Sequence, residues 1–173
     1  IDPEKIEEKI TSRTSAILAL HCYGNPANYS AIEKIAQKYK LRVIYDAAHT
    51  FGVKLKDSNI WSAGDASIVS FHATKSFNTF EGGAVICSSP NLKRSVDYLK
   101  NFGFKDEVTV VGPGINSKMN EFCAAIGILQ LREFERLKDK RRAIDGFYRD
   151  RIPSEIAGPF QYVPELSEPN YSY

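Results

Sequence analysis

Four short apolar runs, each as long as a β-strand, alternate with segments of helical pattern along this chain. The runs are SAILAL (15–20), LRVIY (41–45), ASIVSF (66–71) and GAVICS (83–88). Strands that are apolar along their whole length and are separated by helices are typical of a sheet covered on both faces. The chain is therefore predicted to adopt an α/β fold, a three-layer, doubly wound sheet whose strands are mostly parallel.

Capping residues mark where the helices of this fold begin. Asp2 and Pro3 are typical of a helix N-cap and first position, and Ser30 and Glu33 have the spacing of a capping box. Apolar residues then recur at helical spacing. We predict a short amphipathic helix over 1–10, a helix over 30–40, and later helices near 90–101, 118–137 and 138–151.

The two ends of the chain suggest a piece of a larger protein. The sequence opens at Ile1 inside a helix-start pattern, without an initiator methionine, and stops at NYSY after a polar segment has begun. A proline-rich tail from Pro153 indicates entry into another domain. We expect residues 1–152 to be part of a large domain and residues 153–173 to begin a C-terminal small domain.

Composition excludes several classes of protein. The net charge is +2, and the basic residues are scattered among acidic ones, which argues against a nucleic acid partner. No apolar run approaches the roughly 20 residues of a membrane span, and no signal peptide opens the chain. Cys22, Cys87 and Cys123 lie far apart, without a C-x-x-C or Cys/His cluster, so we expect reduced thiols in a cytoplasmic protein and no metal site.

Side chains able to carry chemistry follow the predicted strands. HCYGNPAN follows the first strand, DAAHTFG the second and HATKSF the third. Ligands of open α/β sheets collect at the carboxyl ends of the strands, which share one edge when the strands are parallel. That edge would carry Asp46, His49, Ser70 and Lys75: a carboxylate, an imidazole, a hydroxyl and an amine.

Lys75 is the most informative of these residues. A loop lysine is usually solvated, but small and aromatic neighbours indicate that this one is partly buried. A buried amine tends to lose its proton, and then acts as a nucleophile toward carbonyl groups. Lys75 is therefore a candidate Schiff-base former, with a solvated surface lysine as the alternative.

The other side chains each have a structural and a functional interpretation. Asp46 either caps a turn or holds the protonated nitrogen of a pyridine ring. His49 is either a hydrogen-bonded structural histidine or a contact to the same ligand. Ser70 is either an ordinary strand serine or a hydrogen-bond donor to a phosphate group. His72 is interpreted as a satisfied, partly buried imidazole, and Glu81–Gly83 as a tight turn. VGPGIN is not a nucleotide fingerprint, so Rossmann and P-loop functions are disfavoured.

Three motifs together resemble one family. VIYDAAHTFG, SFHATKSFNTFEGG and NSKMNEFCAAIGILQL are similar, in order and in spacing, to motifs of the DegT/DnrJ/StrS sugar-nucleotide aminotransferases, a fold-type I pyridoxal phosphate family. The resemblance extends from Ile1 to about Arg151. It implies part of the large domain of a fold-type I aminotransferase, incomplete at both ends.

The resemblance also implies roles for single residues. Lys75 would form the internal aldimine with pyridoxal phosphate, and Asp46 would pair with the pyridine nitrogen. His49 would bond the phenolic oxygen of the cofactor and Ser70 its phosphate. Asn116, in NSKM, matches an asparagine that reaches the cofactor phosphate of the neighbouring subunit, which implies a homodimer with shared active sites.

The implied reaction is transamination of a nucleotide sugar. Glutamate would donate the amino group, and a keto sugar linked to a nucleoside diphosphate would accept it. Chains with SFHATK and NTFEGG resemble enzymes acting on dTDP-4-keto-6-deoxyglucose, in pathways to polysaccharides such as O-antigen.

The chain also departs from the family pattern. Phe80 stands where a glycine is frequent, Lys118 where an arginine is common and Cys123 where a glutamine is frequent. The family's N-terminal phosphate loop and the aromatic residue that stacks on the cofactor ring are absent. We therefore expect this piece alone to be inactive and to bind cofactor weakly, if at all.

Two alternatives to an aminotransferase stay open. One is a lysine Schiff-base lyase without pyridoxal phosphate, such as an aldolase, which would not need Asp46 and His49. The other is a non-catalytic binding or regulatory protein that keeps the aminotransferase fold.

Overall fold

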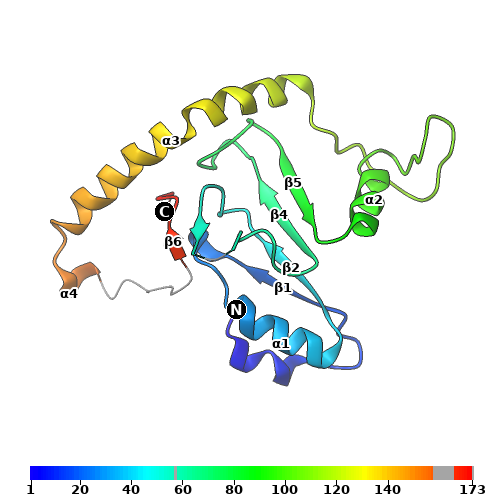
Figure 1. Ribbon diagram of the computed structural model, residues 1–173, viewed down its shortest axis with the longest axis horizontal. Helices are drawn as coiled ribbons and strands as arrows, with labels where there is room; N and C mark the ends of the chain where they lie inside the picture. The colour runs from blue at the N-terminus through cyan, green and yellow to red at the C-terminus, as the bar shows by residue number, and fades with distance from the viewer. Residues whose placement is uncertain (57, 158–165, 173) are drawn as a thin grey trace.

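The central element is a mixed sheet. The computed structural model describes residues 1–56, 58–157 and 166–172. In these residues β1 (Ala16–Leu20), β2 (Arg42–Asp46), β4 (Ala66–Ser70) and β5 (Gly83–Cys87) form a four-stranded sheet in the order β1-β2-β4-β5 (Figure 1). The first three are parallel, and β5 is antiparallel to β4. The predicted strands and the mostly parallel sheet are confirmed.

A second, small sheet joins segments that are distant in sequence. β3 (Lys54–Leu55) pairs antiparallel with β6 (Leu166–Glu168), with Lys54 opposite Glu168. The pairing brings the end of the described chain back beside the loop that follows β2 (Figure 1). The predicted small domain, 153–173, includes residues 158–165 and 173, which lie outside the described residues, so this domain boundary stays a prediction.

Helix α1 (Tyr29–Tyr39) begins earlier than its predicted capping box. Asn28 is the N-cap, and its Oδ1 accepts a hydrogen bond from Ala31 N at 3.1 Å. Ser30 and Glu33 cannot form the box because Ser30 already lies inside the first turn, whereas a capping side chain must precede it. The helix was therefore predicted correctly and its cap was not.

The N-terminal segment forms two 3₁₀ turns, η1 (Pro3–Lys5) and η2 (Glu7–Lys9), and not the predicted amphipathic α-helix. Asp2 does cap the first turn, accepting from Glu4 N at 3.1 Å. Ile6, between the turns, is 7% exposed and belongs to the core. A helix of this length has little stability of its own, so the segment takes the conformation that buries Ile6.

Helix α3 (Glu121–Arg149) is a single helix of 29 residues where two were predicted. No proline interrupts residues 121–149, and ion pairs within the helix continue across the expected break, as between Lys138 and Glu135 at 3.1 Å. None of the helices that the structure describes combines the length and the apolarity needed to cross a bilayer. The remaining helices are α2 (Pro90–Leu99), which agrees with the prediction near 90–101, η3 (Cys22–Gly24) and α4 (Ser154–Ala157).

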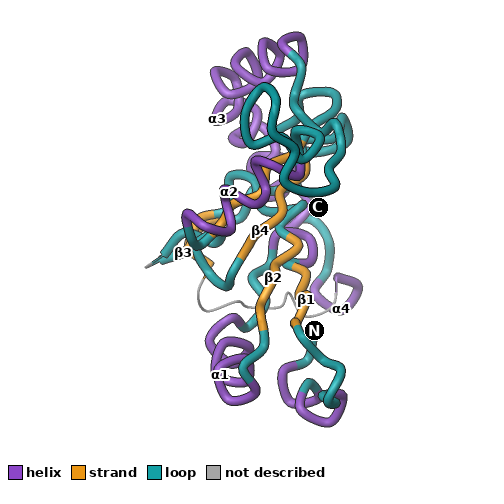
Figure 2. The backbone as a smooth tube through the Cα atoms, turned by 90° about the vertical axis from the view of Figure 1, so that its right-hand side faces the viewer, coloured by secondary structure: helices purple, strands orange, loops and turns teal. Residues whose placement is uncertain are grey.

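The hydrophobic core lies on one face of the sheet, where α1 packs against β1 and β2. Figure 2 shows α1 and the N-terminal turns at one end of the molecule and α3 at the other. The core consists of Ile6, Ile17, Ala19, Ile32, Ala36, Val43 and Tyr45.

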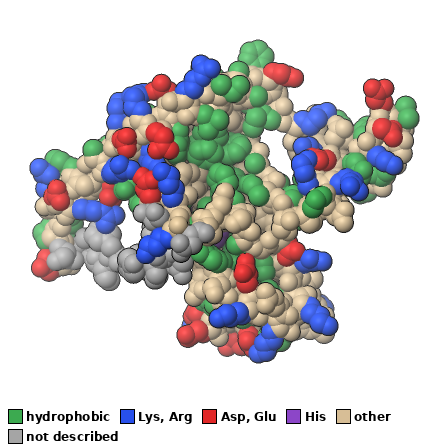
Figure 3. Space-filling model, viewed as in Figure 1, with side chains coloured by type: hydrophobic (Ala, Val, Ile, Leu, Met, Phe, Trp, Pro, Cys, Tyr) green, Lys and Arg blue, Asp and Glu red, His purple; other side chains and the backbone are tan. Residues whose placement is uncertain are grey.

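The opposite face of the sheet is open among the described residues. Leu18, Ile68 and Val85 are 65%, 46% and 46% exposed, although each alternates with a more buried neighbour on its strand. Figure 3 shows hydrophobic side chains gathered over the sheet and below α3. The predicted cover on both faces is therefore not supplied by the described part of this chain.

Candidate active site

The carboxyl ends of the three parallel strands meet at one edge, as predicted. Leu20 is in register with Asp46, and Asp46 with Ile68. The pairing continues past the strands, because His21 N donates to Asp46 O at 3.0 Å and Ala47 N to Ile68 O at 2.8 Å. The turns that follow β1, β2 and β4 therefore lie side by side.

Asp46 is the last residue of β2 and is half-buried. Its Oδ1 accepts a hydrogen bond from Ala48 N at 3.0 Å. This is the turn-capping role of a strand-end aspartate. The cap uses Oδ1, and among the described residues no hydrogen bond to Oδ2 is found.

His49 is held by the turn that follows β1. Its Nδ1 accepts a hydrogen bond from Tyr23 N at 3.1 Å, and the Tyr23 ring stacks on the imidazole with the ring centroids 5.8 Å apart. Loss of solvent contact and the nearby Lys75 cation lower the pKa of His49, while Asp46 acts in the opposite direction. The imidazole is therefore favoured in its neutral form.

Lys75 lies in the turn after β4 and is half-buried, in agreement with its small and aromatic neighbours. Its backbone N donates to His72 O at 2.9 Å, and Asn78 Nδ2 donates to its carbonyl at 3.3 Å. Lys75 and His49 line one small cavity, together with Ala48, Phe51, Ser76 and Ser172. Two of the predicted site residues thus face the same space.

A group of aromatic rings packs the two turns against each other. Phe51, from the His49 turn, stacks on Phe77, from the Lys75 turn, with centroids 4.1 Å apart and planes 12° from parallel. Phe71 meets Phe77 edge-on at 5.1 Å, and Phe134 of α3 meets Phe51 edge-on at 5.0 Å. The group attaches α3 to the edge of the sheet that carries the site.

Ser70 ends β4 at the same edge and is half-buried. Its Oγ accepts a weak hydrogen bond from His72 N at 3.3 Å, so part of its role is local. His72 was expected to be partly buried, but its side chain is 50% exposed. Its imidazole is satisfied, as expected, by the Thr74 hydroxyl at 2.9 Å.

Asn116 is not part of this cluster. It forms an isolated bridge with Asn101 in the loop between α2 and α3, and its side chain is exposed. Figure 1 shows that this loop extends away from the sheet. Within this chain the structure brings together Asp46, His49, Ser70 and Lys75, and leaves Asn116 apart.

The loop before β5 contains an uncommon backbone conformation. Phe80 has φ +63°, in the left-handed region, and its ring is 58% exposed. Gly82 has φ +156°, and a Cβ there would lie 2.5 Å from Thr79 Oγ1. The Glu81–Gly83 turn is tight, as predicted, and Phe80 adopts a conformation that a glycine would take more easily.

Three residues near the site were missed by sequence reasoning. His21 is completely buried, its Nδ1 accepts from Ala27 N at 2.9 Å, and burial lowers its pKa to about 4, although Asp46 acts in the opposite direction. His21 directly follows β1, and this position was the one available signal. Tyr23 and Asn170 reach His49 through main-chain groups, which no residue pattern reveals.

No metal centre is apparent in the part of the chain that the structure describes: it holds no group of three or more His, Cys, Asp or Glu side chains arranged to bind an ion. The chemistry available at the site is that of an amine, an imidazole, a carboxylate and a hydroxyl.

Comparisons with known proteins identify relatives over nearly the whole chain. The profile of the family described as DegT/DnrJ/EryC1/StrS aminotransferase matches residues 1–164. A dTDP-4-amino-4,6-dideoxy-D-glucose transaminase of Shigella dysenteriae is 49% identical over 170 residues, which are 98% of this chain and 46% of that protein. A dTDP-3-amino-3,6-dideoxy-alpha-D-galactopyranose transaminase of Aneurinibacillus thermoaerophilus is 35% identical over 169 residues, 97% of this chain and 46% of that protein.

The fold has close counterparts among solved structures. A crystal structure of DesI in the presence of its TDP-sugar product matches with a TM-score of 0.89 and 34% identity, and the match covers 100% of this chain and 44% of that chain. The chain thus spans about half the length of the relatives that it matches.

Proposed function

Because the chain belongs to the DegT/DnrJ/EryC1/StrS aminotransferase family, we propose that it forms part of a pyridoxal phosphate-dependent aminotransferase. The full-length protein transfers an amino group from glutamate to a nucleotide-linked keto sugar. The observation that carries this proposal is that His49 and Lys75 line one cavity at the edge where Asp46 ends β2.

The chemistry of the donor set supports this cofactor. When bound, pyridoxal phosphate supplies an aldehyde that condenses with amines and a ring that accepts electrons. Lys75 would hold the aldehyde carbon and Asp46 the ring nitrogen, which a carboxylate keeps protonated. His49 would donate to the phenolic oxygen, and Ser70 would donate to the phosphate.

Lys75 would also move protons. With an amino donor bound, its Nζ would accept a proton from the substrate carbon and return it. The Lys75 main chain is bonded to His72 and Asn78, so hydrogen bonds hold the turn that carries this side chain. One residue would thus serve as both the attachment point and the acid–base group.

The relative named for dTDP-4-amino-4,6-dideoxy-D-glucose supports a dTDP-4-keto-6-deoxyglucose substrate, because it is 49% identical to this chain. The product of such a reaction is an amino sugar of the kind used in polysaccharides such as O-antigen. Glutamate as the amino donor follows from the family resemblance.

We also propose that two copies of the full-length protein share their active sites. Asn116 is exposed on a loop that extends from the sheet, and this position supports contact with the cofactor phosphate of a neighbouring subunit. Residues 153–173 would begin the small domain that closes over the substrate. The free thiols of Cys22, Cys87 and Cys123 support a cytoplasmic location.

The test uses the full-length protein and borohydride reduction. After incubation with pyridoxal phosphate and reduction, mass spectrometry of the peptides should locate the cofactor on Lys75. Lys75→Ala should lose the adduct and transamination, whereas Lys34→Ala, an exposed lysine on α1, should keep both. An adduct on another lysine, or normal transamination by Lys75→Ala, would refute the assignment.

The same experiment separates the alternatives. Borohydride would trap a lysine Schiff-base lyase with a carbonyl substrate and no cofactor. In that case Asp46→Asn should not reduce the trapping. A non-catalytic relative would carry the cofactor on Lys75 and transaminate none of a panel of nucleotide keto sugars.

A further inference from the structure

We infer that Tyr23 and Asn170 are positioning residues for His49, which hold its imidazole with the hydrogen on Nε2 and so make Nε2 a donor at the cavity lined by Lys75. The inference rests on the proposed function and deepens it, because it states how His49 is made a donor and which residues do so.

Tyr23 determines the tautomer. Its backbone N–H donates to His49 Nδ1 at 3.1 Å, and a ring nitrogen that accepts from an N–H cannot carry a hydrogen itself. A neutral His49 must then carry its hydrogen on Nε2. Tyr23 itself has φ +54°, in the left-handed region, within the 3₁₀ turn η3.

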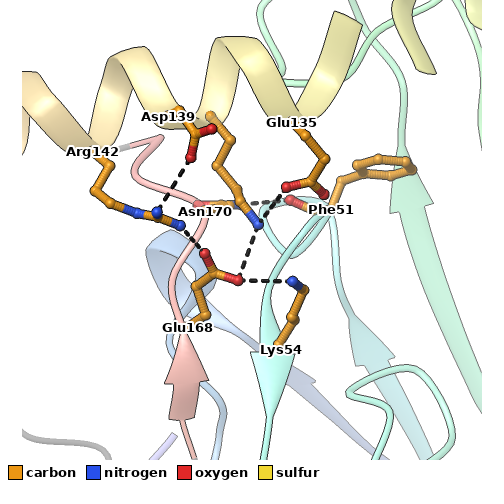
Figure 4. Close-up of polar contacts among 8 residues, drawn as sticks. Phe51, Lys54, Glu135, Asp139, Arg142, Glu168 and Asn170 are labelled. Carbon is orange, nitrogen blue, oxygen red and sulfur yellow. Dashed lines mark hydrogen bonds and ion pairs between the residues drawn. The ribbon is translucent and has the colours of Figure 1, made fainter. Parts of the chain in front are cut away.

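Asn170 fixes the main chain that carries His49. Its Nδ2 donates to His49 O at 2.8 Å and to Phe51 O at 2.9 Å, so one buried amide bonds the chain on both sides of Thr50. Its Oδ1 accepts from Ser172 N at 3.2 Å, and Ser172 lines the same cavity. Figure 4 shows Asn170 pointing toward Phe51. Asn170 is separated from His49 by 121 positions in sequence, so only the fold makes this contact.

A cluster of charges places Asn170. Glu168, two residues earlier, accepts from Lys54 at 2.9 Å on β3 and from Lys138 at 3.1 Å on α3, and it also pairs with Arg142 (Figure 4). The Lys138 side chain is only 1% exposed. These contacts attach β6 to both β3 and α3, so the residues that follow β6 reach the His49 turn in a defined position.

His21 provides an internal comparison. Its Nδ1 also accepts from a backbone N–H, that of Ala27, at 2.9 Å, but its Nε2 is buried and has no hydrogen-bond partner among the described residues. The same tautomer is thus expected for both rings, but of the two histidines only His49 lines the cavity with Lys75.

The experiment measures the tautomer without the cofactor. Full-length, cofactor-free protein labelled with ¹⁵N-histidine is examined by NMR, and the His49 signals are assigned by their loss in His49→Gln. We expect Nδ1 to have the shift of an unprotonated nitrogen and Nε2 that of a protonated one. Tyr23→Gly keeps the N–H and tolerates the positive φ, so it should keep this tautomer although the stacked ring is lost. A hydrogen on Nδ1 in the unmodified protein would overturn the inference.

Asn170 is tested by two substitutions and a matched control. Asn170→Ala removes both donations, and Asn170→Asp keeps the shape but places a carboxylate against two carbonyls. Each should produce mixed or broadened His49 signals and weaken pyridoxal phosphate binding by about ten-fold, as expected for the loss of positioning hydrogen bonds. Asn28→Ala likewise removes an asparagine side chain that bonds the backbone, in this case by accepting from Ala31 N at the start of α1, and should change neither.

The outcomes distinguish this inference from the proposed function. Both Asn170 variants could instead keep the His49 signals and the cofactor affinity and lose only stability, as in Asn28→Ala. Asn170 would then contribute only to the stability of the fold, and its positioning role would be refuted. Borohydride mapping to another lysine would refute the proposed function, while the tautomer measured without cofactor would stand.

Discussion

Phe51 and Phe77 stack with centroids 4.1 Å apart and planes 12° from parallel, and each follows a proposed site residue by two positions, Phe51 after His49 and Phe77 after Lys75. The stack is therefore a direct apolar contact between the two turns. The two rings carry no reactive group, but their contact helps to keep Lys75 and His49 at the same cavity.

Removal of one ring of this stack should loosen the site and destabilise the fold. Phe77 is 4% exposed, and truncating a buried phenylalanine costs about 3–5 kcal/mol. Phe77→Ala should therefore lower the free energy of unfolding by about that amount in urea titrations and weaken cofactor binding. Phe147→Ala, at a ring that is 53% exposed, should cost less than about 1 kcal/mol. Equal losses in the two variants would contradict the role of the stack.

Removal of one partner from the charge cluster around Glu168 should lower the free energy of unfolding more than replacement of its buried cation by an apolar side chain. Lys138 is buried, and Glu168→Gln leaves its ammonium with Glu135 as the one acidic partner among the described residues, which we expect to cost about 3 kcal/mol. Lys138→Met, which removes the charge and keeps the volume, should cost less. Urea unfolding at pH 7 compares the two variants, and a larger loss for Lys138→Met would contradict this account.

Glu168 should also contribute to acid unfolding. Its hydrogen bond with Lys54, together with Lys138, lowers the pKa of Glu168 from 4.5 to about 2. A carboxylate with a lowered pKa in the folded state contributes stability that is present above about 4.5 and is lost as the pH falls toward 2. Glu168→Gln should therefore be less sensitive to pH between 4.5 and 2 than the unmodified protein. Parallel curves for the two proteins would exclude the contribution.

His21 should make the fold sensitive to mildly acidic pH. Burial lowers the pKa of His21 from 6.5 to about 4. Between pH 6.5 and pH 4 this histidine is therefore protonated in the unfolded chain and neutral in the folded chain. The contribution of His21 to the free energy of unfolding is fully present above pH 6.5. It decreases as the pH is lowered, by at most about 1.4 kcal/mol per pH unit. His21→Asn should be less stable at pH 7, because His21 accepts a bond from Ala27, but should lose less between pH 6.5 and 4.

The control for this prediction is His72, whose side chain is 50% exposed. His72→Gln should keep the pH dependence of the unmodified protein in urea titrations. If the slope disappears in His72→Gln and persists in His21→Asn, the assignment to His21 is wrong.

Phe80 is the position where a smaller residue should be tolerated. Its left-handed conformation, φ +63°, costs a residue with a Cβ about 1 kcal/mol, and its ring is 58% exposed. Phe80→Gly should change the free energy of unfolding by less than about 1 kcal/mol, because relief of strain offsets the added freedom of the unfolded chain. Phe80→Val, which is β-branched, should be clearly destabilising. A large loss in Phe80→Gly would show that the ring packs in a way its exposure does not suggest.

The repeating order of strands and helices could be predicted because it depends on local patterns. Apolar runs of strand length identified β1, β2, β4 and β5, and the shared edge of parallel strands placed Asp46, His49, Ser70 and Lys75 together. The errors lie where local signals compete. Asn28 and Ser30 are both residue types that cap helices, and the structure places Asn28 at the N-cap and Ser30 inside the helix.

What the sequence determined by itself was therefore the order of the elements, the edge at which the site would lie and the chemistry of its side chains. The tertiary structure alone decided how that site is held: the Phe51–Phe77 stack, the Tyr23 N–H on the His49 imidazole, and the Asn170 amide on the His49 carbonyl. These contacts join main-chain groups and rings from segments up to 121 positions apart. Nearly every residue carries the same backbone N–H and C=O groups. A pattern of side chains therefore does not predict which of these backbone groups the fold will bring together.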